Sequence, residues 1–330
     1  MRKAIVVEPN RIEIIEAPIP QPSPTQVLIE TRAVGLCTTD VYAITGKDPD
    51  ATFPTDRIGH EPNGVVVEVG REVTRLRPGD RVATLWCVGD FMGFGEYYLQ
   101  EEPRVYHLPE GVPFAHGLAE PLAAISRAVF GADIQPGDAV CVVGAGYFGQ
   151  LIAQGARYRG AYRVGVVDAV PERLTIALAH GADGAYDIRE GGVRRAVEEL
   201  TAGAGFDLVF EVAGVQGAID TATELVRPFG TIYVYGLHVQ RETIDVKAWH
   251  YKCPRLQNNH WPYPFPFDGE RWTRLGGIGL DMLARGVYNC DRIIGGITAL
   301  DDLPAAVEAV THRPHEIVKA VIGPQAGPVA

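Results

Sequence analysis

Residues 139–149, Ala-Val-Cys-Val-Val-Gly-Ala-Gly-Tyr-Phe-Gly, are the most informative stretch of this chain. An apolar run breaks into the pattern Gly-x-Gly-x-x-Gly, and the next apolar run ends on Asp168. A strand, a glycine turn that opens a helix and an acidic residue about 20 positions further on make up the dinucleotide-binding fingerprint. The stretch therefore predicts a parallel α/β domain that binds a dinucleotide.

Each glycine has its own task in this fingerprint. Gly144 permits the tight turn after the strand, and Gly146 lets the backbone approach the pyrophosphate. Gly149 lets the helix lie close to the strand, and the phosphates rest on the N-terminus of that helix. Tyr147 and Phe148 lie between the last two glycines and are expected to contact the cofactor.

The expected cofactor is NAD rather than NADP. Asp168 would accept hydrogen bonds from the adenosine ribose diol, and its charge would repel a 2′-phosphate. Arg173, early on the following helix, either covers the adenosine ribose or is a solvated helix charge. The alternative for the whole stretch is a tight strand-to-helix turn that binds nothing.

Composition restricts the partners of the chain. It has 330 residues, enough for two domains, a formal net charge of −11 and no basic run. We therefore expect no nucleic-acid and no membrane partner, and the N-terminal residues do not read as a signal peptide. The 5 cysteines are scattered without a C-x-x-C pair, which indicates a reducing, cytoplasmic compartment.

The rhythm of apolar residues changes near residue 123. Short β-type runs broken by Pro and Gly come before it, and alternating strands and helices follow. This alternation predicts a doubly wound parallel sheet. Residues 240–270 read as irregular and aromatic-rich. The remaining expected elements are helix 272–286, strand 292–294, helix 301–311 and strand 317–322.

Three segments carry the donor types of a catalytic zinc ion. Cys37 lies in Gly-Leu-Cys-Thr-Thr-Asp, His60 and Glu61 in Gly-His-Glu, and Glu120 in Glu-Pro-Leu. Thiolate, imidazole and carboxylate are the ligands of such sites, which keep one position for water or substrate. Each residue alone has a structural alternative: a buried cysteine, a structural histidine, or a solvated or helix-capping acid. Pro121 disfavours helical geometry at Glu120, which suits a side chain aimed into a cleft.

These motifs resemble the zinc-containing medium-chain dehydrogenases, especially the polyol, sugar and threonine dehydrogenase branch. The resemblance implies a GroES-like, β-rich catalytic domain of residues 1–122 and 266–330, with a Rossmann NAD-binding domain of residues 123–265 inserted between them. The active site would lie in the cleft where these domains meet. The motifs are G-x-C-x-T-D at 35–40, G-H-E at 59–61, R-P-G-D-R-V at 77–82, E-P-L at 120–122 and the glycine turn with Asp168.

The resemblance also implies roles for single residues. Cys37 and His60 become zinc ligands. Glu61 and Glu120 share the remaining inner positions, directly or through water, and exchange there as substrate enters, so Glu61 is also a catalytic residue. Thr39 matches a hydroxyl that hydrogen-bonds the reacting oxygen.

Two positions depart from the family pattern. Tyr42 stands where many members carry a histidine that passes the proton to solvent, so it either relays the proton or only shapes the pocket. The usual second zinc is held by four cysteines after the strand that ends near Leu85, and this chain has only Cys87 there. One cysteine cannot form a structural zinc site, so we expect one zinc per chain.

The implied function is a zinc-dependent dehydrogenase that transfers a hydride between NAD and a secondary alcohol of a polyol, sugar, cyclitol or aminocyclitol. Val212, Gly236 and Leu237, which follow later strands, would face the nicotinamide. Two alternatives remain: a zinc-free enone or quinone reductase of the same superfamily, and an NAD(H)-binding protein without turnover. The expected partners are a small-molecule alcohol or ketone and further copies of the chain in a homo-oligomer. The aromatic segment 249–267 either lines the substrate pocket or forms a subunit contact.

Overall fold

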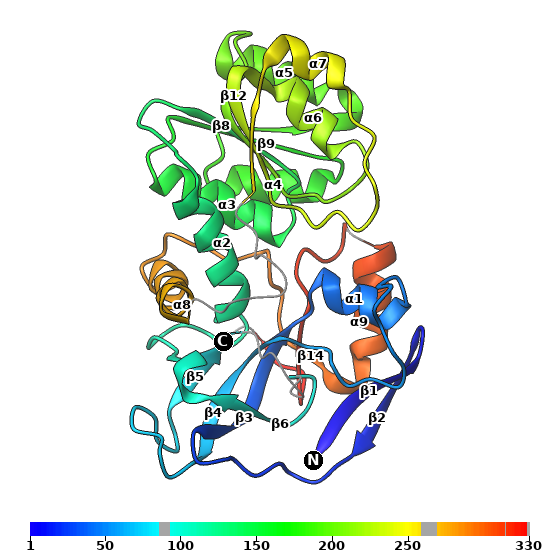
Figure 1. Cartoon of the computed structure of the whole chain (residues 1–330), viewed down its shortest axis with the longest axis vertical. Coiled ribbons are helices and arrows are strands. Elements are labelled where there is room, and N and C mark those ends of the chain that lie inside the picture. Colours follow the sequence, from blue (N-terminus) through cyan, green and yellow to red (C-terminus); the bar gives the residue numbers. More distant parts are fainter. Residues whose placement is uncertain (86–92, 259–268, 314, 329–330) are drawn as a thin grey trace. The chain divides into compact units, whose positions relative to one another are not determined.

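The computed structural model describes residues 1–85, 93–258, 269–313 and 315–328 (Figure 1). Two compact units divide the chain, one of residues 1–123, 268–285 and 290–330, and one of residues 124–267 and 286–289. Gly286–Asn289 thus group with the second unit, whereas the sequence placed them in the returning segment of the catalytic domain. Cys87 and residues 259–267 of the aromatic segment lie outside the described residues.

The second unit is built on a parallel sheet. Among the described residues this sheet has six strands in the order β10-β9-β8-β11-β12-β13, and every adjacent pair is parallel. The order reverses direction between β8 and β11, so their carboxyl ends form the switch point where such sheets bind ligands. The predicted Rossmann-type fold is confirmed. The strands are β8 (Ala139–Val143), β9 (Arg163–Asp168), β10 (Gly184–Asp187), β11 (Phe206–Glu211), β12 (Val226–Val234) and β13 (Arg255–Gln257).

Amphipathic helices cover this sheet. In α5, Val193, Ala196, Val197 and Leu200 recur at helical spacing and pack into the core cluster that contains Phe206. These helices are α3 (Tyr147–Tyr158), α4 (Pro171–Ala179), α5 (Gly192–Thr201), α6 (Ala218–Leu225) and α7 (Val246–Lys252). Helix α2 (Ala119–Gly131) begins in the first unit and continues into the second. The 3-10 turn η2 (Ile188–Glu190) precedes α5.

The first unit combines segments from both ends of the chain. Its main sheet runs β14-β15-β3-β4-β5-β7, β6 also pairs with β3, and β1 and β2 form a separate hairpin. The C-terminal strand β15 pairs with β3, so the returning segment completes this sheet. The strands are β1 (Arg2–Glu8), β2 (Arg11–Glu16), β3 (Gln26–Gly35), β4 (Glu61–Val69), β5 (Arg81–Thr84), β6 (Tyr97–Glu101), β7 (Val105–His107), β14 (Thr298–Ala299) and β15 (Val321–Gly323).

Helices complete the first unit. Leu303, Ala306 and Val307 of α9 pack into a core with residues of β1 and β3. The helices are α1 (Thr38–Thr45), α8 (Gly269–Ala284) and α9 (Leu303–His312), with the 3-10 turns η1 (Glu102–Arg104) and η3 (Leu300–Asp302). The β-rich, GroES-like character predicted for this part of the chain is confirmed.

Some sequence expectations are wrong. Residues 292–294 form a turn rather than a strand: Arg292 has φ 64°, and the backbone N–H groups of Ile293 and Ile294 both donate to Cys290 O. Apolar β-branched residues are buried there without a strand partner, which their pattern alone does not reveal. Of the expected strand 317–322, only Val321 and Ile322 lie in a strand, β15 (Val321–Gly323).

Two further expectations fail for local reasons. The stretch 240–258 is not irregular throughout, because the Asp245 side chain accepts hydrogen bonds from Lys247 N and Ala248 N and starts the short helix α7, which β13 follows. Glu120 is helical, since α2 begins at Ala119. Pro121 then lies in the first turn, where a missing N–H costs no hydrogen bond.

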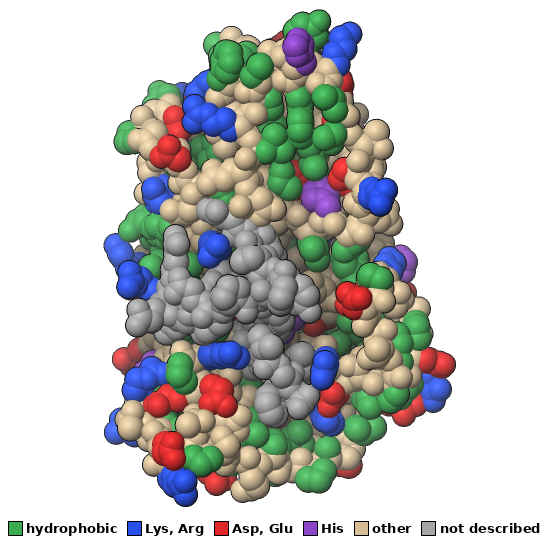
Figure 2. Space-filling view, viewed as in Figure 1, with side chains coloured by type: hydrophobic (Ala, Val, Ile, Leu, Met, Phe, Trp, Pro, Cys, Tyr) green, Lys and Arg blue, Asp and Glu red, His purple; other side chains and the backbone are tan. Residues whose placement is uncertain are grey.

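The surface is mixed in charge. Figure 2 shows Lys and Arg side chains interspersed with Asp and Glu over the described part of the visible face. In the described part of the chain, no helix has the length and apolar character needed to cross a bilayer.

Lys252 ties α7 to the end of α6. Its Nζ donates to the backbone oxygens of Thr223 at 2.8 Å, Glu224 at 2.7 Å and Val226 at 2.7 Å. These carbonyls belong to the C-terminal end of a helix, where a cation is favourable.

Lys252→Met should therefore lower the free energy of unfolding by about 1–3 kcal/mol, because it leaves these acceptors without their charged donor. Urea denaturation followed by circular dichroism measures the effect. Lys247→Met, an exposed position of the same helix, is the control and should change the value by less than about 0.5 kcal/mol. Equal stability of the two variants would show that Lys252 contributes nothing here.

Candidate metal centre and cofactor-binding turn

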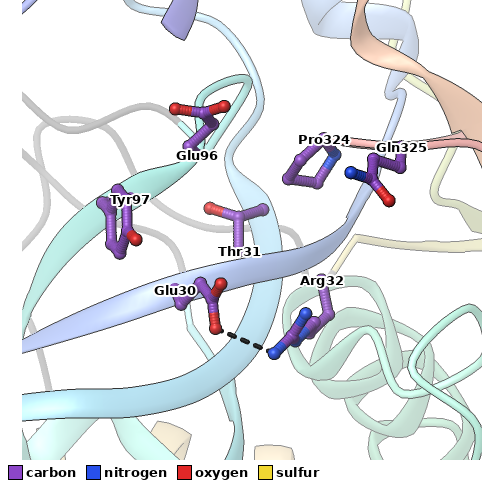
Figure 3. Close-up of a pocket in the computed structure, with 7 residues that line it drawn as sticks. All are labelled: Glu30, Thr31, Arg32, Glu96, Tyr97, Pro324 and Gln325. Carbon is purple, nitrogen blue, oxygen red and sulfur yellow. Dashed lines mark hydrogen bonds and ion pairs between the residues drawn. The ribbon is translucent and has the colours of Figure 1, made fainter. Parts of the chain in front are cut away.

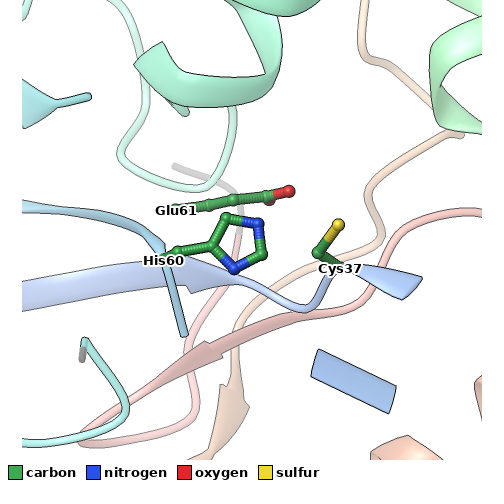
Figure 4. A group of neighbouring side chains, drawn as sticks. All are labelled: Cys37, His60 and Glu61. Atoms are coloured by element: carbon green, nitrogen blue, oxygen red, sulfur yellow. The ribbon is translucent and has the colours of Figure 1, made fainter. Parts of the chain in front are cut away.

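The predicted zinc ligands Cys37, His60 and Glu61 lie together at one end of β3 and β4 (Figure 4). These strands pair antiparallel with Gly35 opposite Glu61, so the residues just beyond the end of β3 meet those at the start of β4. One donor atom from each of the three side chains lies within 4.8 Å of the others. Because zinc–ligand bonds are about 2.0–2.3 Å long, one ion fits among the three atoms after a small closure.

Asp40 holds two of these ligands in place. Its Oδ2 accepts a hydrogen bond from Cys37 N at 2.9 Å, and its Oδ1 accepts one from Gly59 N at 2.8 Å. The same Oδ1 lies 3.2 Å from His60 Nδ1, which leaves Nε2 of the ring for a metal. A carboxylate on the far nitrogen is the usual partner of a metal-binding histidine.

The charges around His60 favour a cation. Burial opposes a charged imidazole, but Asp40 and Cys37 outweigh it and hold the pKa of His60 well above its ordinary value. The same ring lowers the pKa of Asp40 against the opposing effect of burial. Asp40 is the last residue of the motif Gly-Leu-Cys-Thr-Thr-Asp, and the motif alone does not indicate this supporting role.

Glu61 has a buried cationic partner that sequence reasoning missed. Its Oε2 lies 2.5 Å from Lys319 Nζ, and both residues are buried. The sheet explains this contact, because β3 pairs with β4 on one side and with β15 on the other. Among the described residues, Glu61 Oε1 has no hydrogen-bond partner. A Cβ atom at Gly35 would lie 1.9 Å from Glu61 Oε2, so this carboxylate needs a glycine beside it.

Glu120 lies at the margin of this group. Its carboxyl oxygens are not among the donor atoms within 4.8 Å of one another in the described residues. The pKa of Glu120 is raised to about 7, chiefly by burial and also by Glu61, against the lowering effect of His60 and Lys319. These interactions place Glu120 within electrostatic reach of the ligands, and the choice between Glu61 and Glu120 as inner ligand stays a prediction.

Thr39 and Tyr42 lie on the helix that follows Cys37. Thr39 is exposed in the first turn of α1, and Tyr42 is half-buried one turn further on. The helix begins directly after Cys37, so both residues lie within its first two turns after that cysteine.

The glycine turn of the second unit has the shape that a pyrophosphate requires. Gly144 has φ 101°, and a Cβ there would lie 3.0 Å from Ala213 N. A Cβ at Gly149 would lie 1.8 Å from the carbonyl oxygen of Gly144. At Gly146, by contrast, a Cβ would meet nothing within 4 Å. The backbone is therefore tightly packed at Gly144 and Gly149, and it leaves open space at Gly146, where the phosphates would approach.

Asp168 lies at the carboxyl end of β9, next to this turn. Its Oδ2 accepts a hydrogen bond from Ala145 N at 2.6 Å, and its Oδ1 accepts one from Val170 N at 2.7 Å. Gln150, which sequence reasoning missed, donates from Nε2 to Ala145 O at 3.1 Å and to Arg173 O at 2.8 Å. The buried Nε of Arg173 has no hydrogen-bond partner among the described residues.

The other predicted cofactor contacts lie at the same edge of the sheet. Tyr147 is buried at the start of α3, and the ring centroid of Phe148 is 6.2 Å from that of Tyr235. Val212 directly follows β11, and its N–H donates to Val143 O of the neighbouring strand β8. Gly236 and the exposed Leu237 follow β12.

A polar hollow lies apart from these residues in the first unit, between β3, β6 and the segment after β15 (Figure 3). It contains none of the predicted site residues, and its volume is about 330 Å³. Arg32 and Glu30 form an ion pair of 2.8 Å across part of its wall. The lining residues are Glu30, Thr31, Arg32, Glu96, Tyr97, Pro324 and Gln325.

Comparison with known proteins identifies the family. Residues 23–148 match the family described as "Alcohol dehydrogenase GroES-like domain", and residues 148–266 match the one described as "Zinc-binding dehydrogenase". A relative from Rhizobium meliloti (strain 1021), named "Putative D-xylulose reductase", is 30% identical over 348 residues, which cover 96% of this chain and 98% of the relative. A "Sorbitol dehydrogenase" from Halalkalibacterium halodurans is 32% identical over 254 residues, 69% of this chain and 74% of the relative.

A solved structure agrees with these matches. The crystal structure of "a putative zinc-binding dehydrogenase" from Sinorhizobium meliloti 1021, bound to NADP, has a TM-score of 0.80 and 25% identity. The similarity covers 98% of this chain and 99% of that one. The chain therefore belongs to the zinc-containing medium-chain alcohol dehydrogenases and is an oxidoreductase of that family.

Proposed function

We propose that this protein is a zinc- and NAD-dependent dehydrogenase that oxidises a secondary alcohol of a polyol, sugar, cyclitol or aminocyclitol, or reduces the matching ketone. The observation that carries the proposal is the cluster of Cys37, His60 and Glu61, whose donor atoms lie within 4.8 Å of one another. The names of the xylulose reductase and sorbitol dehydrogenase relatives favour a polyhydroxylated substrate.

The residues at the cluster fit one zinc ion. A thiol, an imidazole held by Asp40 and a buried carboxylate oxygen without a hydrogen-bond partner are the donor types of a catalytic zinc site. A bound zinc ion would supply Lewis-acid polarisation of the alcohol oxygen. We propose that Glu120 would be a further residue able to hold the ion, in place of Glu61. The ion pair with Lys319 would then keep the Glu61 carboxylate charged in its buried position.

The proton of the substrate hydroxyl needs a path to solvent. Thr39 is proposed to accept it, because its hydroxyl lies in an exposed first helical turn directly after Cys37. Tyr42, half-buried on the same helix, either continues that path or shapes the pocket.

We propose NAD as the coenzyme because of Asp168. A carboxylate at the carboxyl end of the second strand, bonded to the backbone of the glycine turn, would repel a 2′-phosphate. The NADP in the related structure is a property of that protein. The gap beside Gly146 is the place proposed for the pyrophosphate, and the buried Nε of Arg173 is a donor available to the adenosine half. The proposed partners are a small alcohol or ketone and further copies of the chain.

Metal analysis of the purified protein should give about one zinc per chain. NAD-dependent oxidation of a panel of polyols, sugars, cyclitols and aminocyclitols should form NADH. Cys37→Ala should abolish this turnover, because the thiolate ligand is lost, and should leave NADH binding largely intact. The exposed Cys253→Ser serves as the control and should keep both zinc and activity. Full activity of Cys37→Ala, or activity of the metal-free protein on enones alone, would contradict the assignment.

Asp40→Asn should weaken zinc binding about 10–100-fold, since the histidine loses the carboxylate that orients it. Zinc content after dialysis against a chelator measures this loss, and circular dichroism checks the fold. Asp50→Asn, on the exposed loop after α1, provides the comparison and should retain zinc as the wild type does. If both variants keep their metal equally, Asp40 does not support the site.

Asp168→Ala should raise the Kd for NADH, because hydrogen bonds to the adenosine ribose are lost. It should also reduce the preference for NADH over NADPH, because the charge that repels the 2′-phosphate is lost. Fluorescence titration with NADH and NADPH measures the two Kd values and hence their ratio. Glu172→Ala, an exposed acid at the start of α4, removes the same charge nearby and should leave the ratio unchanged. A wild-type preference for NADPH would overturn the role given to Asp168.

A further inference from the structure

His238 is held between two carboxylates in the second unit. Its Nε2 lies 2.8 Å from Glu211 Oε2, and its Nδ1 lies 2.9 Å from Glu242 Oε1. A histidine ring can donate from both nitrogens only in its protonated form. Burial opposes that charge, but the two carboxylates outweigh it and raise the pKa of His238 above its ordinary value. No motif in the sequence drew attention to this residue.

The inner partner of His238 is Glu211, which hydrogen-bonds the backbone just after β11. Glu211 is fully buried, and its Oε1 accepts hydrogen bonds from Ala213 N and Gly214 N, both at 2.8 Å. A Cβ at Gly236 would lie 2.8 Å from Glu211 Oε2, so this carboxylate also lies against the loop that follows β12. The contact between Glu211 and His238 therefore joins the loops that follow two adjacent strands.

The outer partner, Glu242, connects the loop after β12 to the start of α6. Glu242 accepts from His238 and, at 3.4 Å, from Gly217 N at the start of α6. Gln216 Nε2 donates to Thr243 O at 3.4 Å nearby. Residues 236–243 are thereby fastened across the connection from β11 to α6.

The joined loops lie on one side of the switch point of the sheet. Asp168 and Arg173, proposed for the adenosine half of the coenzyme, belong to β9 and α4 on the other side of β8. A dinucleotide whose pyrophosphate lies at the end of β8 must extend its second half toward the ends of β11 and β12. The loops that His238 joins are the backbone that this half would meet.

We propose that His238 is a positioning residue for the nicotinamide half of the coenzyme: by bridging Glu211 and Glu242, it holds the loops after β11 and β12 in the arrangement that receives the nicotinamide riboside. This inference rests on the proposed function, in which the ligand is a nicotinamide dinucleotide. A purely structural bridge would instead support the unit as a whole. Its loss would then weaken the binding of both halves of the coenzyme equally.

Two ligands separate these cases. NADH spans both halves of the proposed site, whereas ADP-ribose lacks the nicotinamide. His238→Asn is too short to bridge both carboxylates, so it should raise the Kd for NADH about tenfold, the equivalent of one hydrogen bond of ordinary net strength. The Kd for ADP-ribose should change less than about twofold. Fluorescence titration and calorimetry on the zinc-loaded protein give the two constants.

Two further variants complete the experiment. His180→Asn makes the same substitution at the end of α4, the opposite edge of the sheet, and should change neither constant. Glu242→Gln leaves the contact between Glu211 and His238 and should give a smaller loss confined to NADH. If His238→Asn does not fold, Glu242→Gln tests the role of the bridge in its place.

The outcomes are distinct. Unchanged NADH binding in both His238→Asn and Glu242→Gln, or equal losses for NADH and ADP-ribose, would overturn the role of His238 while the proposed function stands. A wild-type protein that binds neither ligand would overturn the proposed function, and this inference with it.

Discussion

The buried ion pair between Glu61 and Lys319 is the contact that sets the charge balance of the candidate metal centre. Burying two charges is costly, and removing either partner would leave the other without compensation in the interior. The pair exists because β3 lies between β4 and β15, so a residue near the N-terminus and one near the C-terminus meet across one strand. The returning chain thus completes the electrostatics of the site as well as the sheet.

A surplus of acidic groups surrounds this pair. Asp40, Glu61 and Glu120 lie around Cys37, and only His60 and Lys319 supply nearby positive charge in the interactions described. A divalent cation among the donor atoms would balance part of that charge. Burial is the main reason why the pKa of Glu120 is raised to about 7, and the neighbouring Glu61 disfavours its charged form as well.

The second unit gathers its polar groups at the carboxyl edge of the parallel sheet. Asp168 ends β9 and Glu211 ends β11, and each accepts hydrogen bonds from backbone N–H groups of a turn at that edge. Both acids therefore shape loops, Asp168 at the glycine turn and Glu211 at the connection to α6. His238 extends the second arrangement to the loop that follows β12. Rigid strands with polar ends thus hold the loops that would enclose a dinucleotide.

The sequence by itself determined the alternation of strands and helices, the glycine turn with Asp168, and the donor types at Cys37, His60, Glu61 and Glu120. These features are local, because periodicity, turn residues and motif spacing act over a few neighbouring positions. Only the tertiary structure decided the partners: Lys319 on Glu61, Asp40 behind His60, and His238 between two acids. The predicted strand 292–294 is absent and the observed strand β13 was not predicted, and both errors have the same cause. Strand pairing and ion pairing join residues far apart in the chain, and local composition does not encode which distant segment a side chain will meet.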